Sequence, residues 1–114
     1  MIEKEQPLPL VWRSLLYVPA TNEKFIKSAH ERGADAVKID LEDSVAIAEK
    51  PRARTLIRSA AKSVAKGGAD VLVRINRPLR MAVKDIEASV WPEVKGLVIP
   101  KVQSSEHYAQ RTEL

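Results

Sequence analysis

The chain contains no cysteine, which excludes a disulfide framework, a thiolate metal site and a cysteine nucleophile. Aromatic residues make up only 4% of it, and no stripe of basic residues alternates with aromatic ones. Nucleic acid binding is therefore not expected, since it relies on such a stripe or on a recognisable binding motif. No apolar run approaches the roughly 20 residues that cross a bilayer, so no membrane partner is expected either.

The amino-terminal residues also lack the features of a targeting signal. Met1 to Gln6 are charged and lean acidic, without the basic start and apolar stretch of a secretory signal peptide. They also lack the Arg-rich character of a transit peptide. The sequence therefore predicts a soluble cytoplasmic protein.

The charged residues are numerous and well mixed. The 19 Lys and Arg residues exceed the 15 Asp and Glu residues, for a net charge of +4, and the two signs are interspersed along the chain. Such a pattern indicates a solvated surface. A mildly basic balance also suits an anionic small molecule, because an arginine can bind a carboxylate or phosphate through two parallel hydrogen bonds.

Four short apolar runs have the character of buried strands, and the second of them alternates apolar and polar side chains along its length. The predicted strands cover residues 14–18, 35–41, 70–76 and 96–102.

Helices are predicted between the strands. Thr21 or Asn22 caps the first helix, and Ser44 is a candidate cap directly after the second strand. Pro51 lies either in the first turn of the main second helix or at a kink. Beyond it an apolar stripe recurs at helical spacing: Leu56, Ile57, Ala60, Ala61 and Val64.

A third helical stretch at residues 83–90 and a last helix opening at Ser104 or Ser105 complete the alternation. Strands alternating with helices predict an α/β fold of parallel β/α units with right-handed crossovers. The pattern alone leaves a choice between a small doubly wound sheet and part of a barrel, which needs about 250 residues when complete. We expect a leader at residues 1–12 and one domain at residues 13–114.

Polar residues follow the apolar runs at the carboxyl ends of the strands, where parallel α/β folds carry their working groups. They are Asp40, Glu42, Asp43, Arg74, Asn76 and Lys101. Carboxylates beside an arginine suit a Mg²⁺ site or a metal-bound water, and the arginine suits a carboxylate or enolate oxygen. The residues equally fit a polar turn before a helix, a structural ion pair of Arg74 and a solvated Lys101.

Four segments taken together resemble one known family. They are RSLLYVPA (13–20), GADAVKIDLEDSV (33–45), VLVRIN (71–76) and GLVIPKV (96–102). In this order they are similar to the citrate lyase β-subunit-like group of the HpcH/HpaI aldolase superfamily, which includes malyl-CoA, citramalyl-CoA and citryl-CoA lyases. The combination of DLEDSV with VRIN carries most of the specificity.

The resemblance implies a TIM (β/α)₈ barrel, of which this chain would form the first half with about four strands. It also implies a Mg²⁺-dependent carbon–carbon lyase, in which a 3-hydroxyacyl-CoA splits into an acyl-CoA and a 2-oxo acid. The chemical demand is to stabilise the enolate of the thioester while the metal polarises the oxygen of the other fragment. The implied partners are therefore a CoA thioester and a 2-oxo acid, and a homo-oligomer is expected.

The resemblance also suggests roles for individual residues. Arg74 would hold the substrate carboxylate and the developing oxyanion, and Asp40, Glu42 and Asp43 would lie near the metal and its waters. The basic residues Arg13, Lys24 and Lys101 are candidates for the substrate and CoA side of the pocket. Sister aldolases that act on free 2-oxo acids usually carry a histidine where this chain has Asp43, which favours the CoA-ester branch.

The sequence departs from the family pattern in two places. Lys38 stands where the family usually has an apolar residue, so it either pairs with an acid or marks unusual packing. The family's metal-binding Glu and Asp belong to later strands beyond Leu114, so no metal ligand is expected within this chain.

Three hypotheses follow. The first is an enzyme fragment that is inactive alone. The second is a non-catalytic half barrel that binds or assembles by pairing its open sheet edge, with another copy or with a separate second half. The third is a small α/β protein unrelated to barrels.

Overall fold

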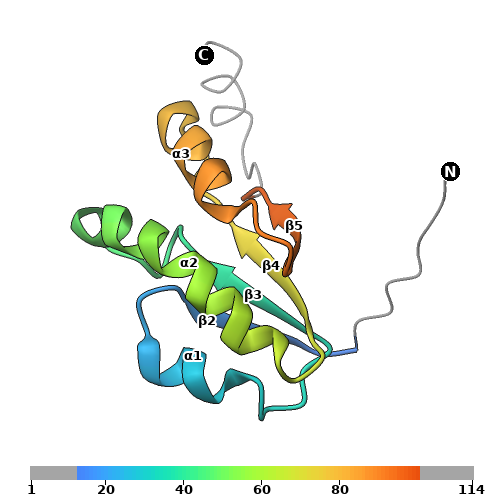
Figure 1. The fold of residues 1–114 in the computed structure, drawn as a ribbon. Helices are drawn as coiled ribbons and strands as arrows, with labels where there is room; N and C mark the ends of the chain where they lie inside the picture. Colours follow the sequence, from blue (N-terminus) through green and yellow to red (C-terminus); the bar gives the residue numbers. More distant parts are fainter. Residues whose placement is uncertain (1–12, 101–114) are drawn as a thin grey trace, which may run out of the picture.

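The computed structural model describes residues 13–100, so the leader, Lys101 and the last predicted helix lie outside the described residues. The elements alternate as expected (Figure 1). In chain order they are β2 (Leu15–Pro19), α1 (Glu23–Ala29), β3 (Ala36–Asp40), a 3₁₀ turn η1 (Ile47–Glu49), α2 (Lys50–Ala65), β4 (Asp70–Arg74), α3 (Leu79–Ser89) and β5 (Val94–Val98). No helix among these residues is long and apolar enough to cross a membrane.

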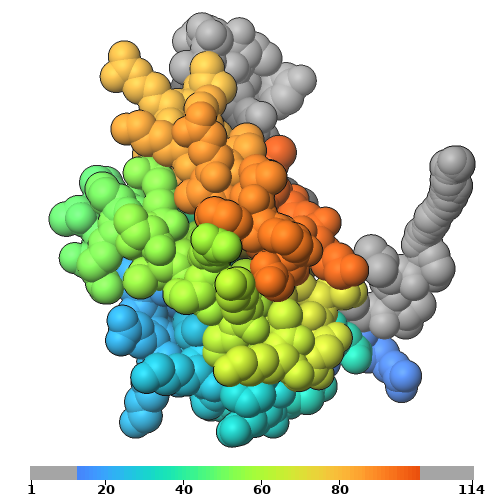
Figure 2. Space-filling view, viewed as in Figure 1, coloured from blue at the N-terminus to red at the C-terminus, as the bar shows by residue number. Residues whose placement is uncertain are grey.

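The four strands form one parallel sheet in the order β2-β3-β4-β5. Helices α1, α2 and α3 lie side by side on one face of it (Figure 1), and their side chains cover that face in the space-filling view (Figure 2). A doubly wound sheet would carry helices on both faces and would reverse its strand order. The α/β prediction is confirmed, and the arrangement is that of consecutive units of a barrel.

The core lies between the sheet and the helices. Val18, Ile39 and Val73 are neighbours across three strands and are fully buried. The predicted stripe of α2 packs against them, with Ile57 and Val64 fully buried. Each such side chain stabilises the fold by about 1.5–3 kcal/mol when it leaves water.

Two boundaries differ from the prediction. The second helix begins at Lys50 with Pro51 in its first turn, and Ser44 does not cap it, because its hydroxyl donates to Asp40 instead. The last strand runs over Val94–Val98 rather than 96–102. It begins earlier because Val94 pairs with Val71 across an irregularity in the register, and it ends before Pro100, which has no N–H for a strand ladder.

The second face of the sheet carries side chains of the opposite parity, and no helix among residues 13–100 covers it. Tyr17, Lys38 and Leu72 form one row across it, and Asp40 and Arg74 form the next row toward the carboxyl ends of the strands. We call this surface the open face. Among the described residues Lys38 forms no ion pair, and its ammonium lies 4.7 Å from the centre of the Tyr17 ring, a cation–π contact on the open face.

Candidate active site

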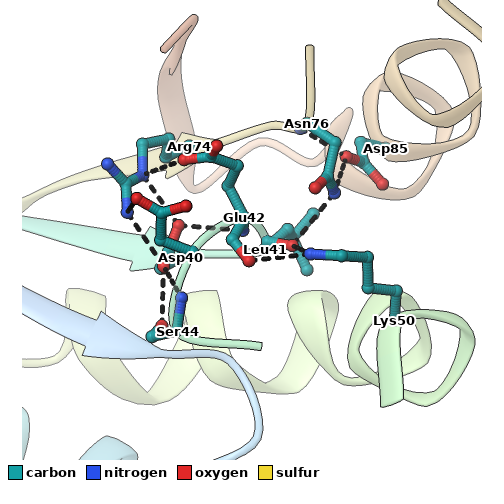
Figure 3. A network of polar contacts seen from close by, with 9 residues as sticks. Asp40, Leu41, Glu42, Ser44, Lys50, Arg74, Asn76 and Asp85 are labelled. Carbon is teal, nitrogen blue, oxygen red and sulfur yellow. Dashed lines mark hydrogen bonds and ion pairs between the residues drawn. The ribbon is translucent and has the colours of Figure 1, made fainter. Parts of the chain in front are cut away.

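The site is built around Asp40, the last residue of β3, whose neighbour in register on β4 is Arg74. Asp40 Oδ1 accepts from Arg74 Nε at 2.8 Å and from the Glu42 N–H at 2.9 Å. Its Oδ2 accepts from Arg74 Nη2 at 3.1 Å, the Ser44 N–H at 2.8 Å and the Ser44 hydroxyl at 2.6 Å (Figure 3). This fully buried carboxylate thus fixes both the arginine and the loop that follows β3.

The hydrogen bonds keep Asp40 ionised. Burial by itself would raise the pKa of its carboxyl group, but the donors on Arg74 and Ser44 and the Glu42 N–H outweigh burial and lower the pKa to about 2. The hydrogen bond to Asp40 in turn raises the pKa of Arg74. The pair is therefore charged throughout the physiological range.

The guanidinium of Arg74 is the cationic centre of the site. Nε and Nη2 are used for Asp40, whereas Nη1 has no hydrogen-bond partner within residues 13–100. The guanidinium carbon Cζ lies 4.7 Å from the centre of the Tyr17 ring, a cation–π contact that restrains the position of the group. With its side chain 19% exposed, Arg74 can offer the free end of its fork to an anion.

Two further carboxylates flank the arginine. Glu42 Oε1 lies 3.5 Å from Arg74 Nε, and Asp43 Oδ2 lies 4.0 Å from Arg74 Nη2. Burial and the negative charge of Asp43 raise the pKa of Glu42, although Arg74 acts in the other direction. The side chain of Asp43 is 79% exposed, so Asp43 influences Glu42 and Arg74 mainly through its charge. A carboxylate with a raised pKa beside a fixed arginine is typical of sites that move protons.

The predicted set is brought together only in part. Asp40, Glu42, Asp43 and Arg74 form one cluster. Lys24 is exposed on α1, and Arg13 precedes β2 at the amino-terminal edge, where its N–H donates to Asp35 at 2.7 Å. The roles of these two residues and of Lys101 stay predictions.

Sequence reasoning missed Tyr17, Ser44 and Lys50 as members of the site. Lys50 was missed because a lysine is normally expected to be exposed to solvent. A signal for it was nevertheless present, since Lys50 continues the buried stripe of α2 toward the amino terminus at a spacing of three residues from Ala53.

The described residues do not by themselves fit a metal. Within residues 13–100 no group of three or more His, Asp or Glu side chains could hold an ion. Both oxygens of Asp40 are taken by hydrogen bonds, which leaves Glu42 and Asp43 as the acidic groups free to meet a cation or its waters. A cavity of about 460 Å³ between α1 and α2, lined by Ile26 and Leu56 among others, lies among the helices and not beside Arg74.

The family model for HpcH/HpaI aldolase/citrate lyase matches residues 13–113. The chain belongs to this family. Membership excludes the hypothesis of a small protein unrelated to barrels. Asp40 and Arg74 are the last residues of β3 and β4, at the carboxyl edge of the strands, where barrel enzymes carry their active sites.

Curated relatives of the HpcH/HpaI family align over most of the chain. The citrate lyase subunit beta of Leuconostoc mesenteroides subsp. cremoris is 37% identical over 94 residues, covering 82% of this chain and 31% of the relative. A (3S)-malyl-CoA thioesterase of Cereibacter sphaeroides is 36% identical (80% and 32%), and the human mitochondrial citramalyl-CoA lyase is 34% identical (82% and 28%). The chain thus spans about a third of the length of these relatives.

Solved structures give the same family and fold. The citrate lyase beta subunit of M. tuberculosis, complexed with oxaloacetate and magnesium, superposes with a TM-score of 0.61 at 29% identity over 84% of this chain and 41% of that one. The protein CitE of Mycobacterium tuberculosis, in complex with magnesium, acetoacetate and coenzyme A, gives 0.61 at 30% identity over 89% and 37%. The four strands correspond to the first half of a TIM (β/α)₈ barrel.

Proposed function

We propose that the chain supplies the arginine and carboxylate part of a Mg²⁺-dependent carbon–carbon lyase site. The substrate would be a 3-hydroxyacyl-CoA of the citryl-, malyl- or citramalyl-CoA type, and the products an acyl-CoA and a 2-oxo acid. The observation that carries the proposal is the Asp40–Arg74 pair at the carboxyl edge of the sheet, with Nη1 of Arg74 unpaired among the described residues. Family membership supplies the class of reaction.

The geometry suits the charges that this cleavage creates. The bond between the α and β carbons breaks, the β hydroxyl loses its proton to become the oxo group, and the electron pair passes to the thioester as an enolate. Arg74, held rigid by Asp40 and Tyr17, can bind the substrate carboxylate or the developing oxyanion with its free nitrogen. Glu42, with its raised pKa, is the described group best suited to exchange a proton.

Mg²⁺ and a CoA thioester enter the proposal through the complexes of the M. tuberculosis relatives. A bound magnesium ion would polarise the oxygen of the departing 2-oxo acid. Since residues 13–100 hold no set of metal ligands, we place those ligands outside the described part of the chain. Glu42 and Asp43 would then hold metal-bound water, and Arg13, Lys24 and Lys101 would contact the substrate or CoA. We further propose a cytoplasmic location and a homo-oligomer.

The test follows the NMR signal of Arg74 Nε while oxaloacetate is added in the presence of Mg²⁺. We expect the signal to shift, and Arg74→Lys to weaken binding about tenfold, because lysine keeps the charge but loses the fork. Arg52→Lys is the matched control, since Arg52 is half exposed on α2 and pairs with Glu49. If the Arg74 Nε signal does not shift, or if Arg74→Lys binds oxaloacetate as tightly as the wild-type chain does, the proposal is wrong.

Turnover is measured separately with malyl-, citramalyl- and citryl-CoA. We expect no cleavage by this chain alone, because the metal ligands are missing from its described residues. Release of a 2-oxo acid that depends on Mg²⁺ and Arg74 would mean that the site is complete. Release of free CoA thiol without a 2-oxo acid would instead indicate thioester hydrolysis, the reaction named for the Cereibacter relative.

The second candidate is a non-catalytic half barrel that binds or assembles through its sheet edge. It is favoured by the uncovered open face and by the outer edge of β5, to which no described strand pairs. Such an edge presents free backbone donors and acceptors to another chain. A stable complex of this chain with another copy or with a separate second half, formed equally well by Arg74→Lys, would favour this candidate over catalysis.

A further inference from the structure

Lys50 is a charged residue in the buried stripe of α2, with only 7% of its surface exposed. Its ammonium donates to the carbonyl of Leu41 at 2.9 Å and to the carbonyl of Glu42 at 2.7 Å (Figure 3). Within residues 13–100 no carboxylate lies within ion-pair distance of it. A lysine in the first turn of a helix could easily extend into water, so this buried position is unusual and calls for a reason.

A second side chain reaches the same carbonyl from the other side. Asn76 Nδ2 donates to the Leu41 carbonyl at 2.9 Å and to Asp85 Oδ2 at 2.7 Å. Asp85, fully buried on α3, also accepts from the Asn76 N–H at 2.7 Å and from Arg54 Nε at 2.6 Å. The Leu41 carbonyl thus accepts from one side chain on α2 and from another in the loop that follows β4.

These contacts fix the backbone that carries Glu42. Its N–H donates to Asp40 and its carbonyl accepts from Lys50, so both peptide groups around its Cα are held. The Glu42 side chain is therefore attached to a backbone that cannot shift easily, and its Oε1 lies 3.5 Å from Arg74 Nε.

We propose that Lys50 is a positioning residue, which with Asn76 clamps the Leu41–Glu42 backbone so that the Glu42 carboxylate faces Arg74. The inference rests on the proposed function of the Arg74 cluster. Lys50 touches neither a substrate nor the guanidinium; it acts through the peptide groups it holds. Removing the ammonium should loosen the loop after β3 while the core of the sheet stays intact.

The first measurement uses amide hydrogen exchange by NMR in Lys50→Met, which keeps the length of the side chain and removes the donors. We expect exchange at the Glu42 amide to quicken about tenfold relative to the Ile39 amide in the preceding strand β3, and Lys50→Arg to restore most of the protection. Lys62→Met, on the exposed side of the same helix, is the control. A purely structural role would speed both amides equally, and an unchanged ratio would overturn the proposal.

A second measurement needs no variant and covers the case in which Lys50→Met does not fold. In the wild-type chain the protons of the Lys50 ammonium should exchange slowly enough with water to be seen, unlike those of exposed lysines. An ammonium that exchanges as fast as that of Lys62 would overturn the clamp.

Oxaloacetate titration of Lys50→Met then separates this proposal from the function it rests on. A severalfold loss of affinity with Arg74 still responding supports positioning, and unchanged affinity in a chain that binds oxaloacetate contradicts it. If the wild-type chain gives no response at Arg74, the proposed function fails, while the exchange data still decide whether Lys50 holds the loop.

Discussion

At the scale of single residues, Asp40 sets the properties of the whole cluster. One buried carboxylate accepts from Arg74, Ser44 and the Glu42 backbone, so its charge orients the arginine and shapes the loop together. A buried ion pair of this kind adds little stability compared with an apolar pair, but its rupture leaves an uncompensated charge. The site is therefore sensitive to loss of either partner.

Replacing Asp40 by Asn should lower the free energy of unfolding by about 3 kcal/mol, because the largely buried Arg74 would lose the carboxylate that accepts hydrogen bonds from two of its nitrogens. Urea denaturation measures this. Glu49→Gln is the matched control: it removes an equally short pair with Arg52 that is half exposed, and should cost about 0.5 kcal/mol. Equal losses for the two variants would show that burial of the Asp40 pair is energetically unimportant.

The pKa of Asp40 also predicts a dependence of stability on pH. The folded value of about 2 lies below the ordinary value of 3.8, so between these values the unfolded chain binds more protons and stability rises with pH. This contribution, about 2 kcal/mol, is complete above the ordinary pKa and is lost as the pH falls toward 2. Thermal melts from about pH 5 to pH 2 should show this loss of stability, and Asp40→Asn should lack this part of the pH dependence.

The protonation of the Glu42 carboxyl group can be followed through the NMR signal of its carboxyl carbon. Burial and the charge of Asp43 both raise the pKa of Glu42, so Asp43→Asn should lower this pKa, while burial and the charge of Asp40 still raise it and Arg74 still lowers it. A ¹³C-detected carboxyl titration reads this pKa directly. Glu31→Gln, an exposed change at the end of α1, should leave the Glu42 titration where it was; a similar shift there would point to a long-range charge effect.

At the scale of elements, apolar runs predicted the bounds of β2, β3 and β4 to within two residues, because strands buried beneath helices must be apolar on the covered face. The carboxyl-edge rule likewise predicted the grouping of Asp40 with Arg74. The predicted position of β5 was wrong because the strand begins where Val94 pairs with Val71 across an irregular register, and hydrophobic periodicity does not reveal such an irregularity. Lys50 and Asp85 were missed because their side chains make hydrogen bonds to partners 8 residues away or more.

The end of α2 provides a test of packing between elements. An added Cβ at Gly67 would overlap the backbone carbonyl of His30, whereas one at Gly68 would meet nothing and would only be strained by its φ of +86°. Gly67→Ala should therefore cost about 2–3 kcal/mol and Gly68→Ala about 1 kcal/mol. Chemical denaturation of both variants compares them, and the reverse order would mean that α1 and α2 separate easily.

At the scale of the whole molecule, the described residues leave apolar surface beside the outer edge of β5, to which no described strand pairs. Helix α3 and its C-cap residue expose four apolar side chains at helical spacing, and the helix packs beside β5: Leu79, Val83, Ile86 and Val90. A stripe of this kind next to a free sheet edge is typical of a surface that another element covers. It is the physical reason to expect association between copies or with further barrel units.

Self-association should therefore weaken when charge enters this stripe. We expect sedimentation velocity to show a dimer or larger species for the wild-type chain, and Val83→Lys to shift it toward monomer. Ile47→Lys, at a residue 80% exposed on η1 and away from the β5 edge, should leave the distribution unchanged. A wild-type monomer at all concentrations would argue against an assembly role.

The contacts that hold Arg74 have a consequence for biosynthesis. All of the hydrogen bonds that fix the loop after β3 join residues between Asp40 and Asp85, with at most 35 positions between partners. Chains leave the ribosome at about 5–20 residues per second, amino terminus first. The loop around Arg74 can thus assemble within seconds of α3 emerging, so β5 would dock onto a sheet edge that is already formed.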